Sequence, residues 1–268
     1  MGALGLIAAG GSSASTPASP HPEPAQLTAR TGIERVQIET EDRQVLIASL
    51  YTPRRRPSDE LAPGAILIHD AGATRQQLTA LAKRMQKQGF CVLIPDLRGH
   101  GESVSADLDF AAEDLAGRER LWAFAARDIK ASATYLHDLE GVHSTNLSLI
   151  GYRAGAVLAT RHAVRDENVR SLIVVEPVIE KTEGEPNFVL TRDDLKRLGG
   201  LPTFVAVSKE HQQRASRLCN AATRASGGGE FIEIAVSKCK SAEILEDKRL
   251  PSLTSKWMDE QASPKRGR

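Results

Sequence analysis

The chain has 268 residues, and its 35 Lys and Arg against 34 Asp and Glu give a formal net charge of +1. This length predicts one well-buried domain. Because the charges nearly cancel, no global field favours nucleic acid or a membrane surface, and we expect neither as a partner. The three cysteines, at 91, 219 and 239, lie far apart with no histidine at ligand spacing. We therefore expect no disulfide framework, no metal site and no cofactor.

The two ends of the chain differ from its middle. Residues 4–11 are short and apolar and residues 12–24 are rich in Ser, Pro and Ala, so we expect 1–30 to be a disordered segment. One interpretation of this segment is the remnant of an export signal with its linker. No basic residue precedes the apolar stretch, which favours a cytoplasmic location slightly over export and leaves both open. We expect one domain over 31–260 and a loose basic tail over 261–268. No run reaches the ~18 apolar residues of a membrane helix, so we expect a soluble domain.

From residue 32 onward, short β-branched or apolar runs alternate with longer helical patterns. This alternation predicts an α/β fold, with a mostly parallel sheet of about eight strands and helices on both faces. The predicted elements, in chain order, are a hairpin (36–40 and 44–51), a polar loop (54–63), a strand (64–69), a helix (74–87) with Thr74 as its N-cap, a strand (90–95), a long helix (119–139), a strand (146–151), a helix (154–164), a strand (172–175), a helix (193–198), two strands (203–207 and 231–236) and a helix (242–259) interrupted near Pro251. None of these connections is long enough for a large lid.

Three motifs follow predicted strands. His69, Asp70, Ala71 and Gly72 come directly after the strand over 64–69, and residues 96–103 read Asp-Leu-Arg-Gly-His-Gly-Glu-Ser after the next strand. Residues 151–155, Gly-Tyr-Arg-Ala-Gly, lie where a strand passes into a helix. In order and placement, these motifs resemble the HGxG turn, the DxRGxGxS loop and the GxSxG elbow of the α/β-hydrolase superfamily, especially its small lidless esterase, peptidase and lipase-like members.

The resemblance implies an α/β-hydrolase fold over residues 36–259, with backbone N–H groups at Ala71 and Ala154 beside the reacting oxyanion. It also implies a nucleophilic serine at the centre of the elbow, where this chain has Arg153. A guanidinium stays protonated up to about pH 12 and offers no lone pair, so it cannot attack an acyl group. His100 and Ser103 are expected to hold the tight loop rather than to act in catalysis.

The other triad positions are also altered. The family's acid follows the strand over 203–207, where either Glu210 or His211 matches it, and its histidine follows the last strand, where this chain has Lys240 and no later histidine. Because triad residues act as a unit, the loss of one removes the selection that keeps the others. The sequence therefore predicts a degenerate triad and a pseudoenzyme that acts as a binding or interaction module. An active esterase-like or peptidase-like hydrolase with a non-standard nucleophile, such as Cys239 or Ser241, is the alternative.

Arg153 would stand at the N-terminus of a helix, where a positive charge is unfavourable by about 0.3–1 kcal/mol, so we expect it to face an anion. Glu176 and Asp70 are the two candidate carboxylates. Pairing with Glu176 would plug the pocket with an internal salt bridge and leave a structural relic or an interaction module. If neither reaches it, Arg153 and the N–H groups of Ala71 and Ala154 would form a site for a small anion or carboxylate ligand.

Overall fold

The computed structural model describes residues 32–53, 61–225 and 232–262. The predicted N-terminal segment over 1–30, most of the predicted loop over 54–63 and nearly all of the basic tail lie outside the described residues.

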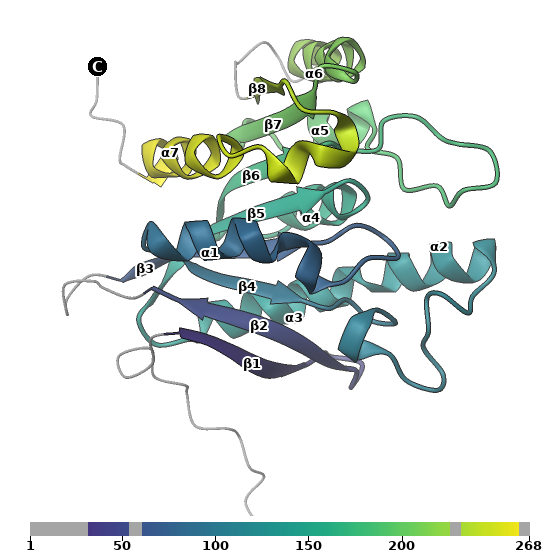
Figure 1. The fold of residues 1–268 in the computed structure, drawn as a ribbon, viewed down its shortest axis with the longest axis vertical. Helices are drawn as coiled ribbons and strands as arrows, with labels where there is room; N and C mark the ends of the chain where they lie inside the picture. Colours follow the sequence, from purple (N-terminus) through teal and green to yellow (C-terminus); the bar gives the residue numbers. More distant parts are fainter. Residues whose placement is uncertain (1–31, 54–60, 226–231, 263–268) are drawn as a thin grey trace, which may run out of the picture.

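Within the described residues, eight strands form one sheet in the order β1-β2-β4-β3-β5-β6-β7-β8 (Figure 1). β3 to β8 run parallel, and β1 and β2 join the edge as an antiparallel hairpin. This confirms the predicted mostly parallel sheet. The strands are β1 (Gly32–Glu39), β2 (Val45–Thr52), β3 (Ala62–Ile68), β4 (Cys91–Pro95), β5 (Val142–Tyr152), β6 (Val169–Val175), β7 (Thr203–Ser208) and β8 (Ile232–Ser237).

Helices cover both faces of this sheet, and each face has its own apolar core. The helices are α1 (Thr79–Lys87), α2 (Leu115–Phe124), α3 (Ala126–His137), α4 (Gly155–Ala163), α5 (Arg192–Lys196), α6 (Gln212–Ala225) and α7 (Leu250–Ala262). α1 and α7 pack on the face toward the viewer in Figure 1, and α2 to α6 supply the other core. In β3, Ala65 and Leu67 join the first core while Ile66 and Ile68 join the second. Burial on both faces explains why the inner strands read as unbroken apolar runs.

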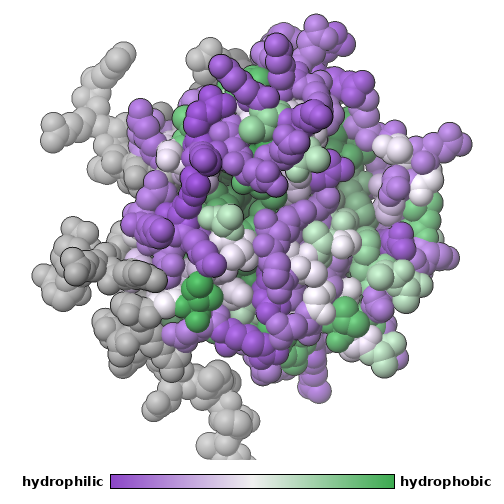
Figure 2. All heavy atoms as spheres, in the orientation of Figure 1, coloured by the Kyte–Doolittle hydropathy of each residue, from purple (hydrophilic) through white to green (hydrophobic). Residues whose placement is uncertain are grey.

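The surface toward the viewer is largely hydrophilic, with apolar side chains gathered in separate patches (Figure 2). No helix within the described residues is both long enough and apolar enough to cross a membrane.

The predicted long helix over 119–139 is wrong in one respect, because the segment forms two helices that meet at Ala125. The first begins four residues earlier than predicted, where the Asp114 side chain accepts a hydrogen bond from the Gly117 N–H. Trp122 in the first helix packs among aromatic rings, whereas Asp128 in the second is buried against Arg98.

Three other predictions need correction. The predicted helix over 74–87 begins as a 3-10 turn (Arg75–Leu78), and the Thr74 side chain bonds to Gln76 and does not cap the helix. Near the C-terminus, a 3-10 helix η4 (Ser241–Glu246) precedes α7, and Pro251 lies in the first turn of α7, where its missing N–H costs nothing. The sequence analysis did not predict α6.

Two glycines allow β5 to turn sharply into α4. A Cβ atom on Gly155 would lie 2.4 Å from the Ile68 carbonyl oxygen, and one on Gly151 would lie 2.5 Å from the Cα of Ala156. The start of α4 is thus pressed against the backbone at the end of β3. Because backbone cannot move aside as a side chain can, any larger residue at these two positions must displace a strand or a helix.

We therefore predict that Gly155→Ala lowers the free energy of unfolding by about 3 kcal/mol or more, because the added methyl overlaps the backbone of β3. Gly184→Ala is the matched control: Gly184 has a φ of +80° but open space around it, so only backbone strain applies. That strain should cost about 1–2 kcal/mol. Urea unfolding of both variants measures the difference, and equal losses would contradict the close approach.

Candidate active site at the carboxyl ends of the strands

Arg153 occupies a strained position between β5 and α4. Its φ is +49°, in the left-handed region that residues other than glycine rarely adopt. The backbone is fixed on both sides, because the Arg153 N–H donates to the Val175 carbonyl (2.9 Å) and the Arg153 carbonyl accepts from the Ala156 N–H (3.1 Å). Strain of this kind persists only where the surroundings hold it, and it is typical of functional sites. The geometry is that of an elbow presenting its central side chain at the edge of the sheet.

Asp70, in the turn after β3, is the carboxylate that Arg153 meets. Its Oδ2 accepts a hydrogen bond from the Arg153 Nε (2.8 Å). Its Oδ1 accepts from the N–H groups of Ala71 (2.9 Å) and Ala154 (3.0 Å). Both N–H groups that the resemblance assigns to the oxyanion hole are therefore bound to an internal carboxylate. The ion pair remains partly open to solvent, with exposed side-chain fractions of 40% for Arg153 and 20% for Asp70.

Glu176, the other candidate partner of Arg153, has a different set of contacts. It lies directly after β6, is 1% exposed and has a φ of +47°. Its carboxylate accepts hydrogen bonds from the Ser208 N–H (2.7 Å) and Oγ (2.9 Å) and contacts the Nδ1 of His211. Pairing between Glu176 and Arg153 therefore does not occur. The sequence analysis gave no role to Ser208, because only the pairing of β6 with β7 brings it to Glu176.

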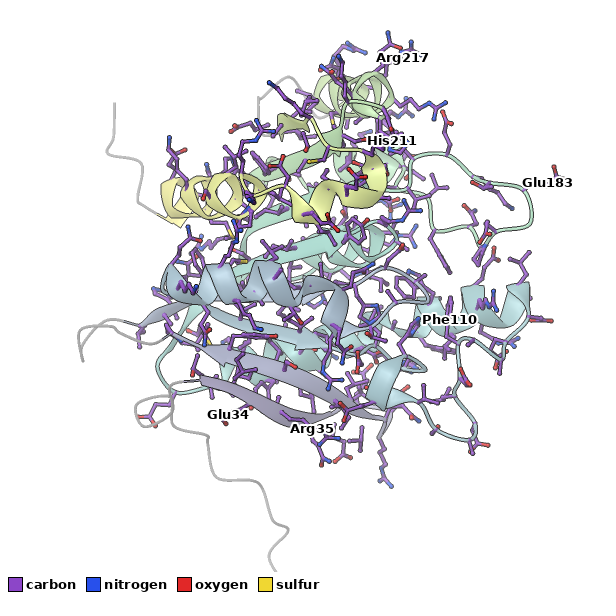
Figure 3. All side chains as sticks on the ribbon, in the orientation of Figure 1. Glu34, Arg35, Phe110, Glu183, His211 and Arg217 are labelled. Carbon is purple, nitrogen blue, oxygen red and sulfur yellow. The ribbon has the colours of Figure 1, made fainter. Side chains whose placement is uncertain are left out.

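The remaining predicted triad positions, Glu210, His211 and Lys240, differ in their exposure and contacts. Of the two residues considered for the acid position, His211 contacts a buried carboxylate, whereas Glu210 is exposed and accepts a long hydrogen bond from the Ser241 N–H (3.4 Å). Lys240, at the position of the family's histidine, is exposed and precedes η4. His211 and Phe110 both lie near the edge where the parallel strands end (Figure 3).

The loop over residues 96–103 is held from inside by charged groups. Arg98 donates from its N–H and its Nε to Asp128 (2.8 Å each) and from its terminal nitrogens to Asp42 (2.8 and 3.0 Å). Burial raises the pKa of Asp128 to about 6, against the opposing effect of Arg98. Ser103 donates to the Asp96 carbonyl and accepts from the Ile47 N–H (2.8 Å each), so it holds the loop as expected. The sequence analysis missed both carboxylate partners of Arg98, because they come from distant segments.

Two buried histidines join this loop to the turn after β3. The Nε2 of His69 accepts from the Leu97 N–H (3.1 Å), and the Nε2 of His100 accepts from the Gly72 N–H (3.0 Å). These bonds require a lone pair on each Nε2, so both rings are neutral with a proton on Nδ1. Burial lowers the pKa of His69 to about 3, and it also lowers that of His100. Both histidines therefore act as structural acceptors.

A cavity of about 640 Å³ opens beside Arg153 and Asp70. Phe110, Phe188 and Val178 supply apolar wall, and Arg118 lies over the Phe110 ring (5.6 Å). This volume and mixed lining are typical of a site for a small organic ligand.

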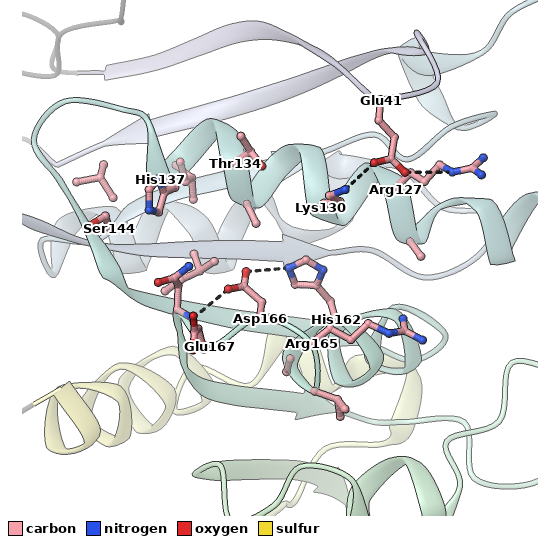
Figure 4. A pocket seen from close by; sticks show the side chains of 18 of the residues that line it. Glu41, Arg127, Lys130, Thr134, His137, Ser144, His162, Arg165, Asp166 and Glu167 are labelled. Atoms are coloured by element: carbon pink, nitrogen blue, oxygen red, sulfur yellow. Dashed lines mark hydrogen bonds and ion pairs between the residues drawn. The ribbon is translucent and has the colours of Figure 1, made fainter.

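A larger cavity of about 880 Å³ runs along α3, beside the start of β5 and the end of α4 (Figure 4). Its charged side chains are largely paired with one another, as in Lys130 with Glu41 (2.6 Å) and His162 with Asp166 (3.1 Å). It contains none of the strained or converging groups found at the elbow, so the smaller cavity is the better candidate site. Among the described residues, no group of three His, Cys, Asp or Glu side chains could hold a metal ion.

Comparisons with known proteins agree with this architecture. An esterase from Pyrococcus furiosus is 14% identical with a TM-score of 0.67, and the match covers 87% of this chain and 92% of that one. An α/β hydrolase from Penicillium sp. is 14% identical with a TM-score of 0.63, covering 86% and 99%. The thioesterase domain from the curacin biosynthetic pathway is 14% identical with a TM-score of 0.60, covering 84% and 100%. Likeness at this identity shows the fold alone, which is the α/β-hydrolase fold.

The family is shown by sequence. The model of the dienelactone hydrolase family matches residues 48–187, just over half of the chain, so the chain belongs to that family. The matched region includes the turn after β3, the loop over residues 96–103, the elbow and Glu176. No curated protein matches the chain.

We predict that His69 makes the fold sensitive to acid. A histidine whose folded pKa lies below its unfolded value of about 6.5 contributes stability that is present above that value and is lost as the pH falls toward about 3. His69→Gln should flatten the dependence of the unfolding free energy on pH in this window, by at most about 1.4 kcal/mol per pH unit. Urea titrations at a series of pH values measure the slope. The exposed His143→Gln is the control, and identical slopes for the native chain and His69→Gln would contradict the assignment.

Proposed function

We propose that this member of the family has lost the covalent serine-hydrolase mechanism and acts as a binding module. One observation carries the proposal: the Asp70 carboxylate occupies both N–H groups of the oxyanion hole while it also pairs with Arg153, the residue at the nucleophile position.

Each half of this arrangement opposes acyl transfer. Arg153 has no lone pair to attack a carbonyl carbon, so no acyl-enzyme can form at the elbow. The developing oxyanion of a substrate would have to displace a tethered carboxylate from the two N–H groups. A hole that already holds an anion gives the transition state no electrostatic stabilisation, which is usually the largest single contribution to catalysis.

We propose a small ligand with an anionic head, such as a carboxylate, for the adjoining cavity. The Arg153 Nε is taken by Asp70, but its two terminal nitrogens have no hydrogen-bond partner among the described residues. A guanidinium can present such a pair of donors to a second carboxylate. The apolar wall at Phe110 and Phe188 would cover the body of the ligand.

Hydrolysis through another nucleophile is the alternative function. Cys239 is partly exposed, and its backbone N–H donates to the Ser237 Oγ (3.1 Å). Arg249 acts on its thiol electrostatically, but among the described residues no hydrogen-bond partner could take the thiol proton, so the geometry supports the binding module better.

We predict that the native chain is not labelled by a fluorophosphonate serine probe and does not turn over a panel of aryl and alkyl esters above a heat-denatured control. Gel fluorescence and product absorbance measure the two quantities. Labelling at a serine, or turnover that resists dialysis and scales with protein concentration, would overturn the loss of catalysis.

We also predict that aromatic and aliphatic carboxylates raise the melting temperature of the native chain. At a ligand concentration of about one hundred times Kd, mass action adds about 2.7 kcal/mol, which corresponds to roughly 5–10 °C. Arg153→Gln should abolish the rise, because the terminal donors are lost. Arg165→Gln, on the wall of the other cavity, is the matched control and should retain it. A rise that persists in Arg153→Gln would place the ligand elsewhere.

A further inference from the structure

Arg118 is a second guanidinium on the wall of the cavity beside Arg153, and the proposed function gives it no part. It lies near the start of α2 and lines the same cavity of about 640 Å³. We propose that the ligand of this cavity is a dianion, in which one carboxylate meets Arg153, an apolar body crosses Phe110 and a second carboxylate meets Arg118. This inference rests on the proposed ligand site at Arg153 and names the class of ligand that the site takes.

The guanidinium of Arg118 is held in place by neutral groups. Its Nε donates to the Phe110 carbonyl, and one terminal nitrogen donates to the Ala111 carbonyl (3.1 Å each). Its Cζ lies 5.6 Å from the centre of the Phe110 ring. Among the described residues, the other terminal nitrogen has no hydrogen-bond partner, and no carboxylate forms an ion pair with Arg118. A guanidinium that is fixed but has no anion is a donor that a ligand carboxylate can use.

The Phe110 ring connects Arg118 to the turn that binds Arg153. A Cβ atom on Gly72 would lie 3.8 Å from the Cε1 of Phe110, so this ring lies against the turn after β3. Asp70 in the same turn accepts the hydrogen bond from the Arg153 Nε. Phe110 therefore contacts Arg118 and also the turn that holds Arg153. A ligand lying along this ring would have a guanidinium available toward each of its ends.

The carboxylates on the cavity wall decide how an anion can be attracted. Asp70 is bound to Arg153. Asp109 accepts a hydrogen bond from the Ala111 N–H (2.9 Å), and Glu185 is exposed. Three carboxylates against two guanidinium groups give the cavity no general attraction for anions. Each carboxylate of a ligand must therefore meet a guanidinium directly, so we expect affinity to depend on the distance between the two charges of the ligand.

Apolar side chains determine the kind of body that the ligand has. Phe110, Phe188 and Val178 contribute apolar surface to the cavity wall. A hydrocarbon body would remove this surface from water, whereas a body with hydroxyl groups would lose hydrogen bonds to water that these side chains cannot replace. The ligand class is therefore a dicarboxylate whose two charged ends are joined by a hydrocarbon chain or ring.

The test compares diacids with their own half-esters. Isothermal titration calorimetry gives Kd for the α,ω-dicarboxylates from succinate to azelate and for the monomethyl ester of each, which keeps the body and removes one charge. At least one diacid should bind the native chain about tenfold more tightly than its half-ester, as expected of one added hydrogen bond between charged groups. Shorter and longer diacids should gain less. Equal affinities of diacid and half-ester across the whole series would overturn the dianion.

Variants assign the gain to one side chain. Arg118→Gln should bring the Kd of the best diacid to that of its half-ester and leave the Kd of the half-ester unchanged, which also shows that the variant is folded. Arg120→Gln is the matched control, because Arg120 is exposed on the same helix and does not line the cavity. It should keep the full gain. A gain that survives Arg118→Gln, or one that Arg120→Gln also removes, would contradict a contact with Arg118.

A measurement on the native chain keeps the proposal open to refutation if Arg118→Gln does not fold. Phenylglyoxal modifies exposed guanidinium groups, and peptide mass spectrometry follows its rate at each arginine. The best diacid should slow modification at both Arg118 and Arg153, whereas its half-ester should slow it at Arg153 alone. Absence of protection at Arg118 by a bound diacid would overturn the second contact.

Failure of this inference is distinguishable from failure of the proposed function. If half-esters bind through Arg153 and the diacids gain nothing from Arg118, only the dianion is overturned. If Arg153→Gln leaves the binding of half-esters unchanged, or if the native chain binds neither class of compound, the proposed ligand site is wrong and the dianion is overturned with it.

Discussion

The Asp70 carboxylate is the group on which the state of the site depends. With one oxygen it binds the N–H groups of Ala71 and Ala154, and with the other it binds Arg153. It supplies the negative charge that a cation at the start of α4 requires, because the helix dipole is unfavourable to Arg153 there. Under the function proposed above, it also gives the loss of catalysis two separate causes. Restoring a serine at the elbow would leave the hole filled, and emptying the hole would leave no nucleophile.

The elbow persists for reasons of packing and independently of chemistry. Gly151 and Gly155 allow β5, α4 and the end of β3 to approach at backbone distance, and His69 and His100 tie the turn after β3 to the loop over residues 96–103. Any change at these positions would disturb the centre of the sheet. Packing alone therefore gives a reason to retain these glycines and histidines, whichever side chain lies between the two glycines.

The sequence predicted the parts of the fold that local patterns determine. The inner strands are buried on both faces and read as apolar runs, and the half-exposed edge strands β1 and β8 were found as well. By contrast, α6 has only Ala215, Cys219 and Ala222 in its core-facing stripe and went unnoticed. The elbow and its arginine could be located because glycine spacing is a local signal. The choice of Asp70 over Glu176, and the contact of Glu176 with His211, depend on which strand ends meet in the sheet. No spacing along the chain contains that information.

The contacts in the structure also change which differences from the hydrolase motifs are physically linked. Because the nucleophile and base of a triad act together, the sequence analysis linked the absence of a histidine after β8 to the arginine at the elbow. The structure instead couples positions 70 and 153, which are 83 residues apart and share an ion pair at 2.8 Å. An aspartate in the oxyanion turn without Arg153 would place an unpaired negative charge beside two N–H groups. Arg153 without the aspartate would leave a cation at a helix N-terminus. Each side chain removes the electrostatic cost of the other, so this ion pair makes no demand on Glu176 or His211.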